Sequence, residues 1–448
     1  MGKQVRGPNR IFTLNTINCV SILTYLINGV KYKIAIALDK QAFFTGLTLM
    51  DILSITDLEL AGKKVLVRVD YNVPINASGK ITDDSRILAS LPTIHYILKR
   101  GGKAILIAHL GRPKGIVEKL RLKPIVERLV TLTNYRVTYI PETIGNTVQN
   151  EIGNLKNGEC LVLENVRFHP GEIQNNMDFA RQLAKLGDIY INDAFGTAHR
   201  AHASTEGITC FLPERAAGFL MEKELRYLSD AINYPQRNFV VLLGGAKVSD
   251  KIATTLRFIE IADALIIGGG MAYTFLASRG ESIGKSLVEK SQLKTAEAVL
   301  KRAEFLKKPI LLPIDHIAVP HPANESLARV VSKIPDGLMG VDIGPETRNR
   351  FAEAIRRAKT ILWNGPMGIF EKPTFLKGTS IIANEVATAT KRGTISIIGG
   401  GDTAAAIKIL GIGGHMSHIS TGGGASLELL EGQKLPGILA LKKMGKTQ

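Results

Sequence analysis

Along most of the chain, from residue 51 onward, short apolar runs are followed by polar or glycine-rich residues and then by a stretch with helical spacing. Most of the runs are apolar on both faces, which indicates parallel strands buried between two layers of helices. We therefore expect a doubly wound, Rossmann-like α/β protein. The predicted strands are Val65–Val69, Ala104–Ala108, Val137–Ile140, Leu161–Leu163, Ile189–Ile191, Phe239–Leu243, Ala264–Ile267, Ile310–Leu312, Ile361–Trp363 and Ile395–Ile398.

The residues at or just past the ends of these strands differ between the two halves of the chain. Open parallel sheets bind ligands beyond the carboxyl ends of their strands, so a site is expected there. In the first half these residues are charged, amide or imidazole side chains: Arg68, Asp70, Asn72, His109, Arg112, Glu164, Asn165, Arg167, Asn192 and Asp193. In the second half they are mainly glycines: 244–245, 268–270, 365, 399–401 and 422–424. We predict a charged pocket in one domain, a backbone cradle in the other, and a cleft between them.

The domain limits follow from the same pattern. At 448 residues the chain is too long for one ordinary core, and its length favours roughly two or three domains. A helical pattern ends at Pro235, which fits one helix joining two parallel-sheet domains. We predict an extension of undetermined status (1–49), an anion-binding domain (50–218), a connecting helix with a hinge (219–235), a second domain (236–430) and a tail that packs as a loop (431–448).

The first 49 residues do not share the pattern of the rest. Lys3, Arg6 and Arg10 precede a charge-free stretch, Ile11 to Val30, which superficially resembles a signal peptide or a membrane span. Asparagines interrupt the stretch, and no small-residue cleavage site is clear. We favour a poorly ordered extension or an upstream start codon with Met50 opening the product, and export through this segment stays open.

Composition and charge narrow the class of protein. The formal net charge of +17 invites a nucleic-acid-binding interpretation, but aromatic residues make up only 6% and no basic block carries interleaved aromatics. An enzyme acting on small polyanions is also expected to be basic, and we prefer this interpretation; nucleic-acid binding is the alternative.

The three cysteines, Cys19, Cys160 and Cys210, form no CxxC pair, so we expect neither a disulfide framework nor a thiolate zinc site. A reducing, cytoplasmic compartment fits best.

In the second half, the stretch from Thr394 to Ile407 is an apolar run followed by three glycines, an aspartate and small residues. This order can lay a phosphate against a helix N-terminus, because Gly399 to Gly401 have no Cβ to block close approach. Asp402 and Thr403 could hold a metal or cap the helix.

A second phosphate signal is a pair of lysines. Lys247 and Lys251 are four residues apart, and we expect them on one face of the first turns of a helix. Cations are unfavourable at that end of the helix dipole, and a bound phosphate would relieve the conflict. An ordinary exposed lysine pair is the alternative.

The first half carries arginines that suit an anionic ligand. Arg68, Arg86, Arg112, Arg167 and Arg200 could grip phosphate and carboxylate groups, and Asp70 with Asn72 could orient a hydroxyl. His109, His199 and His202 accompany them, and we expect hydrogen bonding rather than metal binding because no third ligand follows at a usual spacing. A small phosphorylated acid is the predicted ligand.

Together these residues closely resemble the phosphoglycerate kinase family. The resemblance runs from about Met50 to the C-terminal region and departs from the family in the first 49 residues and at Asp315 to Asn324, which leaves contacts near the nucleoside in doubt. The matching blocks are RVDYNVP (68–74), HLGRP (109–113), LENVRF (163–168), NDAFGTAHRAHAST (192–205), LLGGAKVSDKI (242–252), GGGMAYTF (268–275), LWNGPMGIFE (362–371), GGGDTA (399–404) and STGGGASLELLEG (420–432).

The resemblance implies a reversible transfer of phosphate between 1,3-bisphosphoglycerate and Mg-ADP, which gives 3-phosphoglycerate and ATP. Because the two ligands would lie on two domains and must meet, we expect domain closure. A cleft within a single chain requires no partner, so we expect a monomer, with neither nucleic acid nor membrane as a partner. By motif, the substrate residues would be Asp70, Asn72, Arg86, His109, Arg112, Arg167 and Arg200. The nucleotide residues would be Lys247, Lys251, Gly268, Gly269, Asn364, Glu371, Gly400, Gly401, Asp402 and Thr403, with Mg2+ at Asp402. Arg86, Lys247, Gly401 and Gly424 would act in catalysis.

Overall fold

The computed structural model describes residues 5–7, 10–17, 20–27, 30–37 and 52–442. It divides into two compact units, residues 1–48 and 49–448. In the first unit, β1 (Val5–Gly7), β2 (Arg10–Ile17), β3 (Val20–Ile27) and β4 (Val30–Ala37) form an antiparallel sheet in sequence order. The described residues of the stretch from 11 to 30 thus lie in strands. No described helix is long and apolar enough to cross a bilayer.

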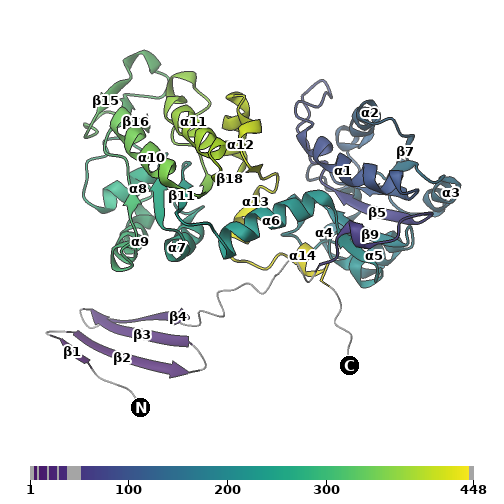
Figure 1. Ribbon diagram of the computed structural model, residues 1–448, viewed down its shortest axis with the longest axis horizontal. Helices are drawn as coiled ribbons and strands as arrows, with labels where there is room; N and C mark the ends of the chain where they lie inside the picture. The colour runs from purple at the N-terminus through teal and green to yellow at the C-terminus, as the bar shows by residue number, and fades with distance from the viewer. Residues whose placement is uncertain (1–4, 8–9, 18–19, 28–29, 38–51, 443–448) are drawn as a thin grey trace. The chain divides into compact units, whose positions relative to one another are not determined.

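The first parallel sheet lies in the larger unit and has six strands in the order β10-β9-β5-β6-β8-β7, with every neighbouring pair parallel. Figure 1 draws helices α1 and α5 on opposite sides of this sheet. The strands are β5 (Lys64–Val69), β6 (Lys103–Ile107), β7 (Val137–Tyr139), β8 (Cys160–Val162), β9 (Ile189–Asp193) and β10 (Arg215–Ala217). The helices are α1 (Ser85–Lys99), α2 (Lys123–Leu132), α3 (Asn146–Asn154), α4 (Pro170–Ile173) and α5 (Met177–Ala184).

Helix α5 shows how the local sequence sets these helices against the sheet. The side chain of Asn176 caps its N-terminus by accepting a hydrogen bond from the Phe179 amide, and Asp178 in the first turn favours the same end of the dipole. Phe179 and Leu183, four residues apart, are buried on one face.

The second parallel sheet also has six strands, in the order β13-β12-β11-β17-β18-β19. Trp363 on β17 is fully buried in the core beneath it. The strands are β11 (Phe239–Leu243), β12 (Ala264–Ile267), β13 (Ile310–Leu311), β17 (Thr360–Asn364), β18 (Ile395–Gly399) and β19 (His418–Ile419). The helices are α7 (Ile252–Ile261), α8 (Met271–Ser278), α9 (Leu293–Phe305), α10 (Pro345–Arg357), α11 (Lys377–Lys391), α12 (Gly401–Ile409) and α13 (Gly424–Leu430). The expected fold class, two doubly wound parallel-sheet domains, is confirmed.

A small antiparallel sheet, β15-β14-β16, is an addition that the sequence pattern did not predict. Its strands are β14 (His316–Val319), β15 (Arg329–Val331) and β16 (Met339–Ile343). Two of them are short, and β15 has exposed side chains, so hydrophobic periodicity gives little signal there. This sheet begins inside the segment 315–324, where the sequence departs from the family pattern.

Two segments of the chain run between the two parallel-sheet domains. Helix α6 (Phe219–Asn233) lies in the range expected for a connecting helix, although the division into units at residues 48 and 49 does not test the finer domain limits. After α13 the chain returns to the first domain, where the short helix α14 (Pro436–Leu439) packs and Gly437 donates a hydrogen bond to the Ala198 carbonyl. The tail therefore contains a buried helical turn where we expected only a loop.

Candidate active site

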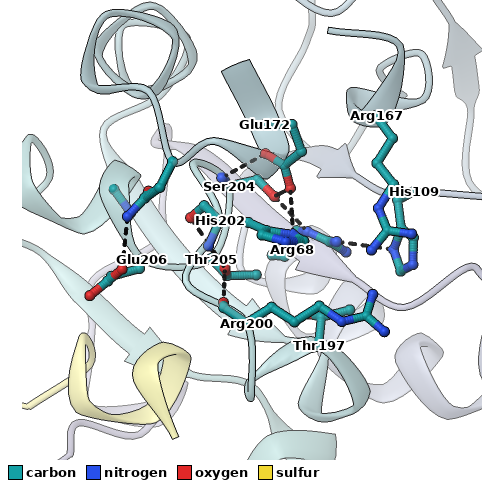
Figure 2. A network of polar contacts seen from close by, with 12 residues as sticks. Arg68, His109, Arg167, Glu172, Thr197, Arg200, His202, Ser204, Thr205 and Glu206 are labelled. Carbon is teal, nitrogen blue, oxygen red and sulfur yellow. Dashed lines mark hydrogen bonds and ion pairs between the residues drawn. The ribbon is translucent and has the colours of Figure 1, made fainter. Parts of the chain in front are cut away.

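Arg68 is the buried centre of the charged group in the first domain. It lies on β5 and is fully buried. Its Nε donates to Ser204 Oγ at 2.9 Å, and its Nη2 donates to His109 Nδ1 at 3.1 Å. Figure 2 shows Arg68 extending between these two partners. The strand end thus supplies a cation that is anchored before any ligand arrives.

Arg167 and Arg200 lie beside this centre. Arg167 follows β8 in a 3-10 turn that Asn165 caps, and its Nη1 donates to the Gly111 carbonyl at 2.6 Å. Burial, together with the charges of Arg200 and Arg68, lowers the pKa of Arg167 to about 10. Such a concentration of guanidinium groups is unfavourable by itself, and an anionic ligand would relieve it.

The three histidines of this group are held neutral. Burial is the main cause that lowers the pKa of His109 well below its ordinary value, and the charges of Arg68 and Arg167 act in the same direction. The same causes lower the pKa of His202 to about 4, and burial lowers that of His199. At neutral pH these side chains are therefore uncharged hydrogen-bonding groups.

Arg86, on α1 of the first domain, contacts residues of both domains. Its Nη1 lies 2.6 Å from Asp70 Oδ2, and its Nη2 donates to the Thr421 carbonyl at 3.5 Å. Thr421 immediately precedes the glycines 422–424, so the ion pair of the first domain touches the glycine-rich turn of the second. A further ion pair between the domains joins Lys408 on α12 to Asp83 at 2.8 Å.

The remaining predicted substrate residues lie around the same loop. Asn72 Oδ1 accepts a hydrogen bond from the Gly111 amide at 2.9 Å, and Gly111 also accepts from Arg167. Arg112 is exposed, and its charge contributes to lowering the pKa values of Arg167 and Arg200. The structure therefore brings together Asp70, Asn72, Arg86, His109, Arg112, Arg167 and Arg200.

In the second domain a cavity of about 350 Å³ contains part of the predicted nucleotide set. Gly269, Glu371 and Asp402 line it. Gly268 does not; its missing Cβ makes room for the Met367 side chain. The apolar wall, which the sequence analysis missed, is formed by Tyr273, Leu287, Met339, Val341, Met367 and Ile369. These residues come from parts of the chain up to about 100 residues apart, so only the fold brings all of them together.

Lys251 lies next to this cavity at the ends of β11, β17 and β18. Its Nζ donates to Asn364 Oδ1 at 2.5 Å, and the positive φ of Gly400 keeps the backbone close to the same amide. Burial lowers the pKa of Lys251 to about 8, although the nearby Asp402 acts in the opposite direction. Thr403 Oγ1 accepts a hydrogen bond from the Gly365 amide at 2.6 Å. An ammonium group in this position can meet a phosphate with little reorganisation.

The expected placement of the two lysines on the first turns of a helix is wrong. Helix α7 begins at Ile252, with Lys251 at its N-cap position. The preceding turns are held by Glu289, which accepts hydrogen bonds from the amides of Val248 and Ser249. Lys247 is exposed and makes no hydrogen bond within residues 52–442. The turn before α7 is thus held by the carboxylate of a residue far away in sequence.

The glycine-rich strand exit has the geometry that the sequence predicted. Strand β18 ends at Gly399, Gly400 occupies the N-cap position with φ of 83°, and α12 begins at Gly401. Gly401 has open space where a side chain would lie. Gly424 opens α13, and a Cβ there would lie 3.9 Å from His199 Nε2. Both turns thus leave helix amides reachable.

A larger cavity, of about 850 Å³, joins the two halves of the site. Arg86 of the first domain and Gly401 and Gly423 of the second line it. Arg86 therefore faces two glycine-rich turns of the second domain across a cavity.

Asp402 is the side chain that can hold a metal here. It is exposed in the first turn of α12 and lines the smaller cavity. The described part of the chain contains no cluster of three or more His, Cys, Asp or Glu that could hold a metal ion alone. Mg2+ is commonly bound by one or two carboxylates together with substrate phosphates, so Asp402 fits that ion jointly with a nucleotide.

Comparison with known proteins decides the family. A family model described as phosphoglycerate kinase matches residues 55–433. The chain belongs to the phosphoglycerate kinase family. The residues before 55, including the four-stranded unit, lie outside the match.

Relatives and solved structures agree with this family. Phosphoglycerate kinase from Thermosynechococcus vestitus is 52% identical over 391 residues, which cover 87% of this chain and 97% of that protein. Cytosolic phosphoglycerate kinase from Triticum aestivum is 50% identical over 387 residues, covering 86% and 96%. The structure of phosphoglycerate kinase from Coxiella burnetii is similar, with a TM-score of 0.79, 38% identity and coverage of 87% and 98%. The resemblance read from the motifs is confirmed, and none of these comparisons supports the nucleic-acid-binding alternative.

Proposed function

We propose that this protein catalyses the reversible transfer of phosphate between 1,3-bisphosphoglycerate and ADP, giving 3-phosphoglycerate and ATP, as a glycolytic kinase. The observation that carries this proposal is the common space between Arg86 and the glycine turns at Gly401 and Gly423. Arg86 of the arginine group thus lies across a cavity from the glycine turns that would receive the nucleotide phosphates, and the family membership gives the reaction its class.

In this proposal the first domain holds the phosphoglycerate. Arg112, Arg167 and Arg200 would bind its phosphate and carboxylate oxygens, with His109 as a neutral hydrogen-bonding group. Asp70 and Asn72 would orient the hydroxyl. The surplus of cations around Arg167 supports this assignment, because the protein itself supplies too few carboxylates to balance them.

The second domain would hold the nucleotide. Lys251, Asn364 and Thr403 lie at the glycine-rich strand ends, where phosphates would approach the backbone amides of Gly400 and Gly401. Gly269 and Glu371 would complete the pocket, and Gly268 would leave room for the Met367 side chain in its wall. Asp402 would hold Mg2+, which when bound neutralises charge on the nucleotide phosphates.

The transfer needs no covalent intermediate on the protein, since an in-line displacement depends on positioning and charge stabilisation. Arg86 and Lys247 would stabilise the charge on the migrating group, assisted by amides around Gly401 and Gly424. Exclusion of water protects the acyl phosphate, so the domains would close about the region of α6 during the reaction. X-ray scattering curves that do not change when 3-phosphoglycerate and nucleotide are added together would count against closure.

A coupled assay tests the proposal. The wild-type protein should form ADP from ATP and 3-phosphoglycerate, and Arg86→Ala and Lys247→Ala should each reduce kcat by at least about tenfold, the scale of one lost charge-stabilising group. Arg136→Ala is a matched control, because Arg136 is 71% exposed and pairs with Glu159 at 3.4 Å, away from the site residues. Turnover near the wild-type value in Arg86→Ala or Lys247→Ala would remove that residue from the mechanism, and an inactive wild type would refute the function.

We further propose a cytoplasmic monomer that uses neither nucleic acid nor membrane. Both ligand sites come from a single chain, and a relative described as cytosolic is 50% identical. Sedimentation equilibrium of the full chain should return the mass of one copy; a stable larger species would contradict the monomer.

A further inference from the structure

The buried Arg68 is held on the side away from the site by a carboxylate that plays no part in the proposed reaction. Glu172 on α4 is fully buried. It accepts hydrogen bonds from Ser204 Oγ at 2.7 Å and from the Ser204 amide at 2.9 Å. Its own carbonyl accepts from the Ala203 amide at 3.0 Å. The hydroxyl of Ser204 thus gives its proton to Glu172 and accepts a hydrogen bond from Arg68 Nε.

The position of Arg68 is consequently fixed along its length. Tyr190 donates to the Ser204 carbonyl at 2.8 Å, which further fixes the segment carrying the hydroxyl. Figure 2 shows the sequence of contacts from Glu172 through Ser204 and Arg68 to His109. The far end of this series is the Nη2 group, 3.1 Å from His109 Nδ1.

The contact with His109 has only one possible direction. A guanidinium group carries donors and no acceptor, so Nδ1 of His109 must accept. A neutral imidazole that accepts at Nδ1 carries its proton on Nε2. Within residues 52–442 the structure gives Nε2 of His109 no hydrogen-bond partner, so this N–H remains available to a ligand.

We infer that Arg68 is a positioning residue that fixes His109 as the neutral Nε2–H tautomer and so makes it a hydrogen-bond donor to the phosphoglycerate. The identity of that ligand rests on the proposed function, whereas the tautomer does not. Protonation of His109 would remove the acceptor at Nδ1. The charged groups that face it are all cations, Arg68, Arg167, Arg200 and Arg86, and they oppose protonation.

The tautomer can be measured in the free protein. Two-bond 1H–15N correlation spectra distinguish protonated from unprotonated ring nitrogens, and the His109 signals can be assigned by their loss in His109→Gln. In the wild type we expect an unprotonated Nδ1 and a protonated Nε2 at pH 7. In Arg68→Met we expect a mixture of tautomers, and in the control Arg136→Met no change.

Kinetics test the consequence for the ligand. Arg68→Met and His109→Ala should each raise the KM for 3-phosphoglycerate roughly tenfold, as expected for the loss of a hydrogen bond to a charged group, and leave the KM for ATP unchanged. If Arg68 acts through His109, the double variant should be no worse than His109→Ala alone.

The outcomes separate this inference from the proposed function. A protonated Nδ1 in the wild type would overturn the inference without the need for any variant. A folded Arg68→Met protein with an unchanged tautomer, or additive effects in the double variant, would also overturn it. A wild type that shows the expected tautomer but does not turn over 3-phosphoglycerate would refute the proposed function alone.

Discussion

At the scale of single residues, burial leaves some charged groups without full compensation of their charge, and a ligand of opposite charge can supply it. Lys251 is half-buried and lies between Asn364 and Asp402, and its pKa is lowered to about 8 because desolvation outweighs the nearby carboxylate. At neutral pH it still carries a proton, but the protein has not fully compensated the charge. A phosphate brought next to it would supply the missing compensation.

This arrangement predicts proton uptake when ADP binds. A phosphate near Lys251 raises its pKa, so at pH 8, where the free protein holds it about half protonated, binding should take up as much as about half a proton per site. Calorimetric titrations in buffers with different ionisation enthalpies measure this number. Lys251→Met should abolish the uptake, and equal uptake in both proteins would assign it to another group.

Sequence alone could predict many single residues of the site but not their surroundings. Arg68 lies near the end of a strand and Arg167 follows one, and Arg86 and Asp402 lie in the first turns of helices. These positions can be recognised from the sequence pattern. The role of Glu172 could not be predicted, because it depends on a contact with Ser204, 32 residues away. The apolar residues beside Asp402 carry no chemical signature, and only the packing of the second domain identifies them.

At the scale of elements, the strands could be predicted because β-branched and apolar residues are concentrated in them. The start of α7 could not be predicted from the sequence. The carboxylate of Glu289 occupies the amides of Val248 and Ser249 from 40 residues or more away, a contact that no local pattern reveals. The start of α6 also depends on a distant residue. Asp193, at the end of β9, accepts hydrogen bonds from the Leu220 and Met221 amides.

Asp193 predicts a pH dependence of stability. Burial is the main cause that raises its pKa from 3.8 to about 7. Between these values the folded state holds a proton that the unfolded state has lost, so the free energy of unfolding falls as pH rises through this range. Asp193→Asn keeps an oxygen to cap α6 and should lose that part of the pH dependence. At pH 8 its free energy of unfolding should exceed that of the wild type by on the order of 1 kcal/mol, which appears as a higher denaturant midpoint.

Asp193→Ala is the matched comparison, because it removes both the charge and the cap. It should lower the free energy of unfolding at pH 5 by about 1 kcal/mol, the usual scale for an N-cap. Denaturant midpoints followed by circular dichroism at pH 5 and pH 8 give both results. If the wild type and Asp193→Asn change equally between the two pH values, a different group is responsible.

At the scale of the whole molecule, the second unit, residues 49–448, contains all the elements of the proposed reaction. The family match begins at residue 55. A chain beginning at Met50 should therefore keep the kcat, KM values and unfolding midpoint of the full chain, measured in the same coupled assay and by circular dichroism. Lower activity in the shortened chain would show that the first unit contributes to function.

A deeper truncation provides the contrast. Residues 52–58 belong to the first domain: Ile52 pairs with Lys442, Ser54 pairs with Ala217, and Ile55 is fully buried. A chain beginning at Leu60 should be less stable by at least about 2–4 kcal/mol, the scale of one lost core isoleucine. Equal stability of the two shortened chains would contradict this account of where the domain begins.

The return of the C-terminal segment to the first domain has a mechanical consequence. Two domains joined by a single linker could swivel about it in any direction, but here α6 and the segment after α13 both span the junction. Two attachment points define a line, and rotation about that line strains neither of them. In the proposed closure, motion that brings the arginines toward the glycine turns would therefore be mainly a rotation about that line, and the reacting groups would meet along a repeatable path.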